Sequence, residues 1–203
     1  MSSVTHHDIH TSQYREIEMA SYTFTTPLTS EDTKQLVAGD TVLLNGTIYT
    51  ARDAAHKRLV ELIEAGKELP FDLEGSIIYF VGPTPPKPGD PIGSAGPTTS
   101  YRMDSFSPTM LKNGSKGMIG KGKRDQGVKD ACVEYDGIYF GATGGAGALL
   151  GKQITSAEVI AYPELGPEAI RKITVKEFPV TVINDTKGND LYQMGRAQYE
   201  VKD

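Results

Sequence analysis

The sequence contains a single cysteine, Cys132, and no tryptophan among its 203 residues. One thiol excludes an internal disulfide framework and fits a reducing compartment. It also excludes an iron–sulfur site held by this chain alone, because such sites normally take three or four thiolates. The chain lacks an apolar run near the roughly 18 residues of a membrane helix, and its first residues lack the basic-then-apolar order of a signal peptide. These absences predict a cytoplasmic protein.

An excess of basic residues is also absent. The formal net charge is -5, with 21 Lys and Arg against 26 Asp and Glu, which argues against non-specific binding to nucleic acid or to an anionic membrane. Hydrophobic residues make up 38% of the chain, as in an ordinary domain with a core. We expect a single catalytic domain over residues 21–203, preceded by a polar, flexible extension over residues 1–20.

Short apolar runs alternate with amphipathic segments along the chain, which predicts an α/β domain. A capping box at Thr29 and Asp32 begins a short helix, and Asn45-Gly46 predicts a hairpin between two short strands within residues 41–51. Further helices are expected over residues 53–64, 105–112 and 125–134, and further strands over residues 76–81, 117–120, 137–141, 157–162, 173–178 and 180–184. Hairpins at both ends of the chain predict that the sheets are mixed.

The Gly- and Ala-rich segment 144–153 does not fit a nucleotide-binding loop. A phosphate loop needs a glycine five positions before the glycine that precedes its lysine, and a hydroxyl residue after the lysine. Here Ala146 and Gln153 occupy those positions. We interpret the glycines of this segment as sites of close helix–sheet packing.

The most informative segment is the loop 93–104, with the sequence Gly-Ser-Ala-Gly-Pro-Thr-Thr-Ser-Tyr-Arg-Met-Asp. Gly96 can take backbone angles that are closed to other residues, and Pro97 fixes its own φ angle. A loop of this kind holds Thr98, Thr99 and Arg102 in one place. The arginine suits a carboxylate or oxyanion, because its planar guanidinium offers donors matched to two oxygens.

Two further cations follow predicted strands. Arg52 comes directly after the segment 41–51, and Lys121 comes after the strand 117–120 with a glycine on either side. Strand-to-helix ends are where α/β domains place ligands. Together with Arg102, these cations suggest an anionic substrate with two carboxylates. The alternative for each is a solvated surface charge, which the rigid loop and the neighbouring glycines disfavour.

The hydroxyl and imidazole groups near these cations have more than one interpretation. Adjacent threonines after a proline, such as Thr98 and Thr99, often only hydrogen-bond a turn. Alternatively, nearby cations lower the pKa of one hydroxyl so that it acts as a base. We expect His56 to pack or to orient its neighbours, and Cys132 to be a thiol of the core.

Three segments carry a family resemblance: Thr-Ala-Arg-Asp-Ala-Ala-His-Lys-Arg at 50–58, Gly-Pro-Thr-Thr-Ser-Tyr-Arg-Met-Asp at 96–104 and Ile-Gly-Lys-Gly at 119–122. In this order they resemble the β subunit of class I fumarate hydratase, whose family includes the β subunit of L-tartrate dehydratase. The resemblance runs from about Thr25 to Asn189. It implies a swivelling β/β/α domain that works with an α subunit, in an α2β2 assembly.

The resemblance also implies an activity and a division of roles. The α subunit carries a [4Fe-4S] cluster whose non-thiolate iron binds the substrate, and the complex hydrates fumarate reversibly to (S)-malate. Arg52, Arg102 and Lys121 match the ligands of the substrate carboxylates. Thr98 matches the base that removes a proton from the carbon beside a carboxylate, with Thr99 as the alternative. The β chain alone is then inactive.

Several alternatives stay open on the sequence. Ala51 departs from the Thr-Gly-Arg-Asp that such fumarases usually show, whereas the continuation 53–56, Asp-Ala-Ala-His, favours fumarase over tartrate-type chains. L-tartrate or methylfumarate (mesaconate) are the alternative substrates. A hypothesis from another class is a non-catalytic swivelling module that closes over a different protein, which has no need for three cations and a threonine at one place.

Overall fold

The computed structural model describes residues 20–142 and 147–199, so that nearly all of the predicted extension, residues 1–20, lies outside it. The elements in chain order are β1 (Ser21–Thr25), α1 (Ser30–Gln35), β2 (Thr41–Thr50), α2 (Asp53–Glu64), β3 (Ile77–Tyr79), η1 (Ser100–Met103), α3 (Ser107–Lys112), β4 (Gly117–Gly120), α4 (Gln126–Glu134), β5 (Ile138–Gly141), α5 (Gly147–Lys152), β6 (Ile154–Ala161), η2 (Pro163–Glu168), β7 (Ile170–Asn184) and α6 (Leu191–Tyr199).

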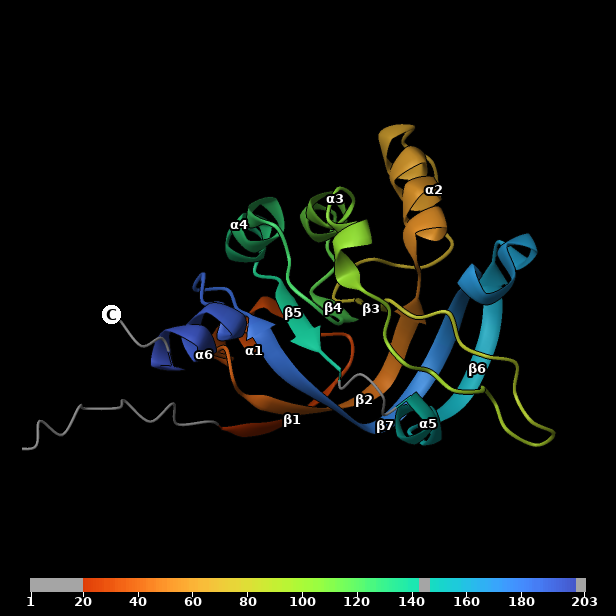
Figure 1. Cartoon of the computed structure of the whole chain (residues 1–203). Helices are drawn as coiled ribbons and strands as arrows, with labels where there is room; N and C mark the ends of the chain where they lie inside the picture. Colours follow the sequence, from red (N-terminus) through yellow and green to blue (C-terminus); the bar gives the residue numbers. More distant parts are fainter. Residues whose placement is uncertain (1–19, 143–146, 200–203) are drawn as a thin grey trace, which may run out of the picture.

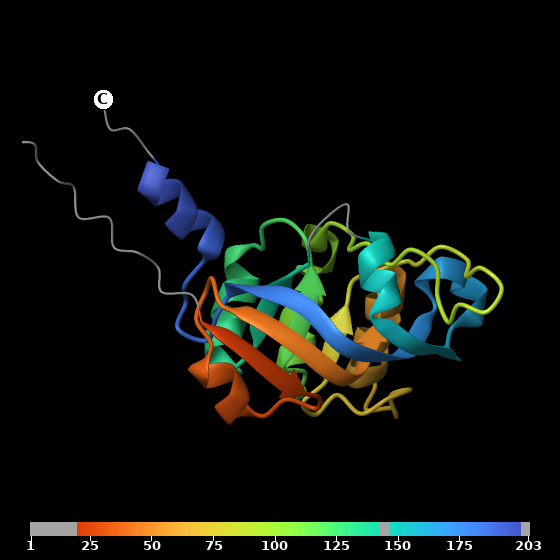
Figure 2. The same ribbon diagram turned by 90° about the horizontal axis from the view of Figure 1, so that it is seen from below.

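The seven strands form one mixed sheet in the order β1-β2-β3-β4-β5-β7-β6. Strands β2, β3, β4 and β5 run parallel, whereas β7 runs antiparallel to β5 and β6. β7 also pairs antiparallel with β2, and this pairing closes the sheet into a barrel (Figures 1 and 2). The predicted α/β class with a mixed sheet is confirmed.

The predicted hairpin at Asn45-Gly46 is wrong, because β2 is one strand of ten residues. β2 pairs with β7 on both sides of this dipeptide, with a shift of register between Leu44 and Gly46. Gly46 has a φ of +96°, and a Cβ there would lie 2.7 Å from Thr26 Oγ1. The dipeptide therefore marks a β-bulge, since the long partner strand continues across it.

The other predicted elements are confirmed, with ends that shift by at most three residues, except that the last two predicted strands join into β7. Thr29 and Asp32 form the expected capping box of α1. Strand β1 and helix α6 were not predicted. In β1 exposed residues alternate with half-buried ones, so that its sequence carries little apolar signal.

Alternation along the strands divides the core into two layers. Tyr79, Phe140 and Phe178 belong to a cluster built from every barrel strand, whereas the neighbouring Phe80 and Tyr139 face the opposite way and pack with helix residues. Helices α2, α3 and α4 cover this outer face together, as Figure 1 shows. Both faces of the central strands are thus buried, which explains their continuous apolar runs. Among the described residues, no helix has the length and apolarity of a membrane span.

Candidate active site

The parallel strands end together at one edge of the barrel. Thr50 of β2 is level with Tyr79 of β3, which is level with Ile119 of β4. Arg52 and Lys121 each lie two residues beyond this row. The structure therefore places these two predicted site residues on the same edge, where ligands of parallel α/β sheets usually bind.

A short stretch of the predicted rigid loop inserts between the ends of β3 and β4. Thr98 donates its backbone N–H to the carbonyl of Phe80 at 2.8 Å, and Ser100 donates to the carbonyl of Lys121 at 2.9 Å. Thr99 forms a parallel bridge with Lys121. Both threonines are half-buried. They therefore lie on the edge that also carries Arg52 and Lys121.

Arg52 is held from several sides. It precedes α2 in an extended conformation, and its Nη2 lies 3.1 Å from Oε1 of Glu168 in η2. A Cβ at Gly82 would lie 3.0 Å from Nη1, so the guanidinium packs closely against the backbone at this position. Nε lies 3.9 Å from Oδ1 of Asp53, and neither buried atom has a hydrogen-bond partner among the described residues.

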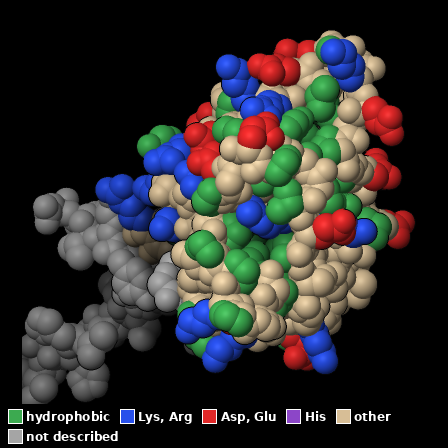
Figure 3. All heavy atoms as spheres, turned by 90° about the vertical axis from the view of Figure 1, so that its right-hand side faces the viewer, with side chains coloured by type: hydrophobic (Ala, Val, Ile, Leu, Met, Phe, Trp, Pro, Cys, Tyr) green, Lys and Arg blue, Asp and Glu red, His purple; other side chains and the backbone are tan. Residues whose placement is uncertain are grey.

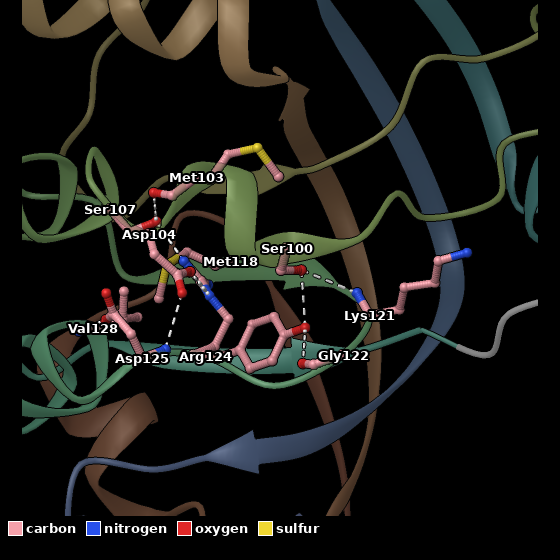
Figure 4. Close-up of polar contacts among 11 residues, drawn as sticks. Ser100, Met103, Asp104, Ser107, Met118, Lys121, Gly122, Arg124, Asp125 and Val128 are labelled. Atoms are coloured by element: carbon pink, nitrogen blue, oxygen red, sulfur yellow. Dashed lines mark hydrogen bonds and ion pairs between the residues drawn. The ribbon is translucent and has the colours of Figure 1, made fainter.

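Arg102 and Lys121 are instead exposed. Arg102 lies in η1, directly after the inserted stretch. The side chain of Lys121 extends away from the hydrogen-bonded network beneath it (Figure 4). Within residues 20–142 and 147–199, neither cation forms an ion pair. The ammonium of Lys121 and the guanidinium of Arg102 are thus available to an anion from solution or from a partner.

The face on the side of α2 and β6 is shown in Figure 3. Hydrophobic side chains and tan atoms, which are uncharged side chains and backbone, occupy much of its middle, and acidic side chains lie mainly in its upper part and on its right-hand side.

His56 is buried behind Arg52, on the first turn of α2. Its Nδ1 lies 2.9 Å from the carbonyl of Arg52, and because a carbonyl only accepts, the neutral ring carries its proton on Nδ1. The ring meets Phe80 edge-on at 5.3 Å. Burial, together with the nearby Arg124, lowers the pKa of His56 to about 4. The imidazole is therefore neutral at pH 7 and orients the start of α2.

The sequence did not identify Arg124, whose guanidinium is fully buried under the site (Figure 4). Its Nε donates to Asp104 Oδ1 at 2.6 Å, and its Nη2 donates to Ser107 Oγ at 2.6 Å. The guanidinium also lies over the rings of Phe80 and Tyr139. Because Asp104 follows η1 and Arg124 lies in the loop after β4, this pair joins the two segments that carry Arg102 and Lys121.

The described residues do not form a metal centre by themselves. No group of three or more His, Cys, Asp or Glu in the described part of the chain is placed to hold a metal ion. Cys132 is buried in α4, and burial raises the pKa of its thiol to about 12. It is a core thiol, as predicted.

The glycines at 147 and 151 pack against the loop rather than the sheet, which corrects the sequence interpretation of these glycines, whereas Leu150 of the same segment packs into the barrel core. A Cβ at Gly147 would lie 2.6 Å from Ser94 Oγ, and one at Gly151 would lie 2.8 Å from the carbonyl of Gly93. Gly147 also accepts a hydrogen bond from Ala95 N at 3.0 Å. The glycines of α5 thus support the loop that leads to Thr98. Residues 143–146 of this segment lie outside the described residues.

Comparison with known proteins identifies the family of this chain. The family model described as Fumarase C-terminus matches residues 3–195. The chain therefore belongs to the Fumarase C-terminus family.

Its relatives are hydratases and dehydratases, and hence hydro-lyases. The chain is 49% identical over 152 residues to "Fumarate hydratase class I, anaerobic" of Escherichia coli (strain K12), a match that covers 74% of this chain and 28% of the relative. It is 39% identical over 186 residues to "Putative L(+)-tartrate dehydratase subunit beta" of Methanocaldococcus jannaschii, covering 88% and 95%. It is 37% identical over 172 residues to "L(+)-tartrate dehydratase subunit beta" of Escherichia coli (strain K12), covering 82% and 84%. The chain thus spans little more than a quarter of that fumarate hydratase but most of both tartrate dehydratase subunits.

We expect the buried ion pair to contribute strongly to stability. Arg124→Met leaves Asp104 without its partner, and removing one member of a buried pair costs about 3–5 kcal/mol. Adding Asp104→Asn to this variant should recover part of the loss. The exposed pair Arg58–Glu164 provides the control, because Arg58→Met should cost at most about 1 kcal/mol. Urea unfolding measures all three, and equal losses for Arg58→Met and Arg124→Met would contradict this assignment.

His56 should make the fold sensitive to acid. Its pKa is about 4 in the folded chain and about 6.5 when unfolded. As the pH falls, His56 of the unfolded chain therefore takes up a proton before His56 of the folded chain does. Folding stability falls as the pH drops below about 6.5. Between pH 8 and pH 5 the loss from this residue is about 2 kcal/mol. From pH 8 to pH 5, the free energy of unfolding should fall by about 2 kcal/mol less in His56→Gln than in wild type. If the free energies of unfolding of the two proteins change in parallel with pH, His56 is not responsible.

Proposed function

We propose that this chain supplies the substrate-carboxylate ligands and the proton-transferring hydroxyl of a hydro-lyase that hydrates fumarate reversibly to (S)-malate. One observation carries the proposal. Arg52, Thr98 and Lys121 lie at one edge of the barrel, and Arg102 follows directly in η1. A dicarboxylate has two anionic ends, and this edge with the adjoining η1 offers three cations and two hydroxyls. The family supports the reaction class.

The cations have distinct tasks in this proposal. Arg102 and Lys121 are exposed and meet the carboxylates of the incoming substrate. Arg52 is already oriented by Glu168, whose Oε1 lies 3.1 Å from its Nη2. Its Nε has no hydrogen-bond partner among the described residues and is left to donate to a further acceptor. As the proton leaves the carbon, negative charge grows on the adjacent carboxylate, and fixed cations stabilise that charge.

Thr98 removes the proton from the carbon beside a carboxylate when malate is dehydrated, and returns it when fumarate is hydrated. A free threonine hydroxyl is a weak base, but neighbouring cations favour its ionised form. Its backbone bond to Phe80 at 2.8 Å fixes it at the end of β3. Thr99 is the alternative base, one residue along and bridged to Lys121.

The cofactor implied by the resemblance is a [4Fe-4S] cluster, a Lewis acid toward a substrate hydroxyl when bound. This chain does not fit as its holder, because its single cysteine is buried in α4 and its thiol stays protonated at neutral pH. We propose that an α subunit holds the cluster and that the two chains form an α2β2 assembly. The relatives named as tartrate dehydratase beta subunits support a two-subunit enzyme.

L-tartrate is the second candidate substrate. The chain matches 95% and 84% of two proteins named as tartrate dehydratase beta subunits, whereas its identity to a class I fumarate hydratase is higher, at 49%. The same cations suit either of these dicarboxylates, and they suit methylfumarate as well. A non-catalytic swivelling module is the hypothesis from another class, and such a module has no need for these cations and a threonine at one edge of the barrel.

Alanine variants of Thr98 and Thr99 test which of the two hydroxyls is the base. In the complex with its α subunit, Thr98→Ala should lower the turnover number by about 10²–10⁴-fold, the usual contribution of a positioned acid–base group. The KM should change little, because the three cations remain. Thr99→Ala should be milder, with a loss of stability as well as of rate.

The measurement is exchange of the malate C3 proton with solvent deuterium, catalysed by the complex. Thr98→Ala should lose this exchange and Thr99→Ala should keep it. The opposite pattern would move the base to Thr99. Undiminished exchange in both variants would assign the base to the α subunit and contradict the proposed role of this chain.

A further inference from the structure

Two buried hydroxyls lie directly beneath Lys121. Ser100 Oγ and Tyr139 OH are 2.9 Å apart, and both residues are fully buried. Ser100 Oγ accepts the backbone N–H of Lys121 at 3.1 Å. Tyr139 OH donates to the carbonyl of Gly122 at 2.9 Å. The pair thus contacts the backbone on either side of one exposed side chain.

The directions of these hydrogen bonds follow from the groups themselves. The carbonyl of Gly122 only accepts, so the single proton of Tyr139 OH points toward it. Ser100 must then donate its own proton to the tyrosine oxygen, while its lone pair receives the N–H of Lys121. Three bonds thus run in one direction along a chain from the N–H of Lys121 to the carbonyl of Gly122, and bonds linked in this way strengthen one another.

This chain of hydrogen bonds explains the glycines of the Gly-Lys-Gly motif. A Cβ at Gly120 would lie 1.9 Å from Ser100 Oγ, so any side chain there would expel the serine. Gly122 has a φ of +86°, which turns its carbonyl back toward Tyr139 in a conformation that other residues rarely adopt. The two glycines of the motif therefore make room for the two hydroxyls, in addition to flanking the lysine.

The tyrosine ring is itself fixed from below. The buried guanidinium of Arg124 lies 4.8 Å from the ring centroid, and Asp104 and Ser107 hold that guanidinium in place. A ring stacked on a fixed cation cannot tilt without losing this contact. The hydroxyl of Tyr139 is therefore held in one position under Lys121.

We infer that Ser100 and Tyr139 are positioning residues for Lys121. By fixing the backbone before and after the lysine, they fix the direction in which its side chain leaves the edge, so that less freedom is lost when the ammonium binds a carboxylate. The inference rests on the proposed function, in which Lys121 binds a carboxylate of the substrate. Neither hydroxyl touches the substrate in this scheme.

The experiment uses the complex of this chain with its α subunit and two variants that each remove one hydroxyl, Tyr139→Phe and Ser100→Ala. Each should raise the KM for malate by about 10-fold, the upper end of what one lost hydrogen bond produces, with a smaller change in kcat. The backbone N–H of Lys121 should exchange with deuterium faster in both variants. Ser115→Ala is the matched control, because Ser115 is an equally buried serine that donates to the carbonyl of Ser76 at 3.2 Å, just before β4 begins. It should leave both the KM and the exchange at Lys121 unchanged.

A double-variant comparison separates positioning from general loosening. In the background of Lys121→Met, Tyr139→Phe should raise the KM no further, because the side chain that it positions is gone. An equal further rise would refute the inference, as would an unchanged KM in Tyr139→Phe alongside faster exchange at Lys121. A wild-type complex that turns over none of fumarate, malate or tartrate would instead refute the proposed function, and the role of Lys121 with it.

Discussion

The arrangement of this edge depends on the insertion of one short stretch of chain between two parallel strands. The hydrogen bonds from Thr98 to Phe80 and from Ser100 to Lys121 extend the sheet by a segment that is not itself a strand. The insertion requires a position without a side chain, since a Cβ at Gly120 would lie 1.9 Å from Ser100 Oγ. Two hydroxyls and a lysine are thereby placed on neighbouring chain segments that share backbone hydrogen bonds.

A buried layer of charge and aromatic rings supports the exposed cations. Arg124, paired with Asp104 and stacked over Phe80 and Tyr139, links the loop that carries Arg102 to the loop that carries Lys121. A buried pair adds little stability compared with an apolar equivalent, but it has few alternative arrangements once its donors are satisfied. That property suits a platform for ligands, in which a displacement of about 1 Å lowers rates markedly.

The sequence predicted much of the fold, and it placed Arg52 and Lys121 on one edge for a physical reason. Central strands buried on both faces are continuous apolar runs, and the carboxyl ends of parallel strands share one side of the sheet. The bulge at Gly46 was mistaken for a hairpin, because only the distant pairing of β7 keeps β2 continuous. Arg124 was missed for a similar reason, since its partner Asp104 lies 20 residues away and a lysine-rich neighbourhood suggests solvent. Local pattern determines elements, whereas long-range pairing determines which charges are buried.

The central claim is that the exposed guanidinium of Arg102 binds a substrate carboxylate. The most direct test is the steady-state kinetics of fumarate hydration by the complex of this chain with its α subunit, for wild type and for Arg102→Lys. Lysine keeps the charge but loses the two-point contact, so we expect kcat/KM to fall by about 30-fold or more, corresponding to roughly 2–5 kcal/mol, with unfolding unchanged. Kinetics of Arg102→Lys that match wild type would show that Arg102 is a solvated surface residue and would contradict the proposed site.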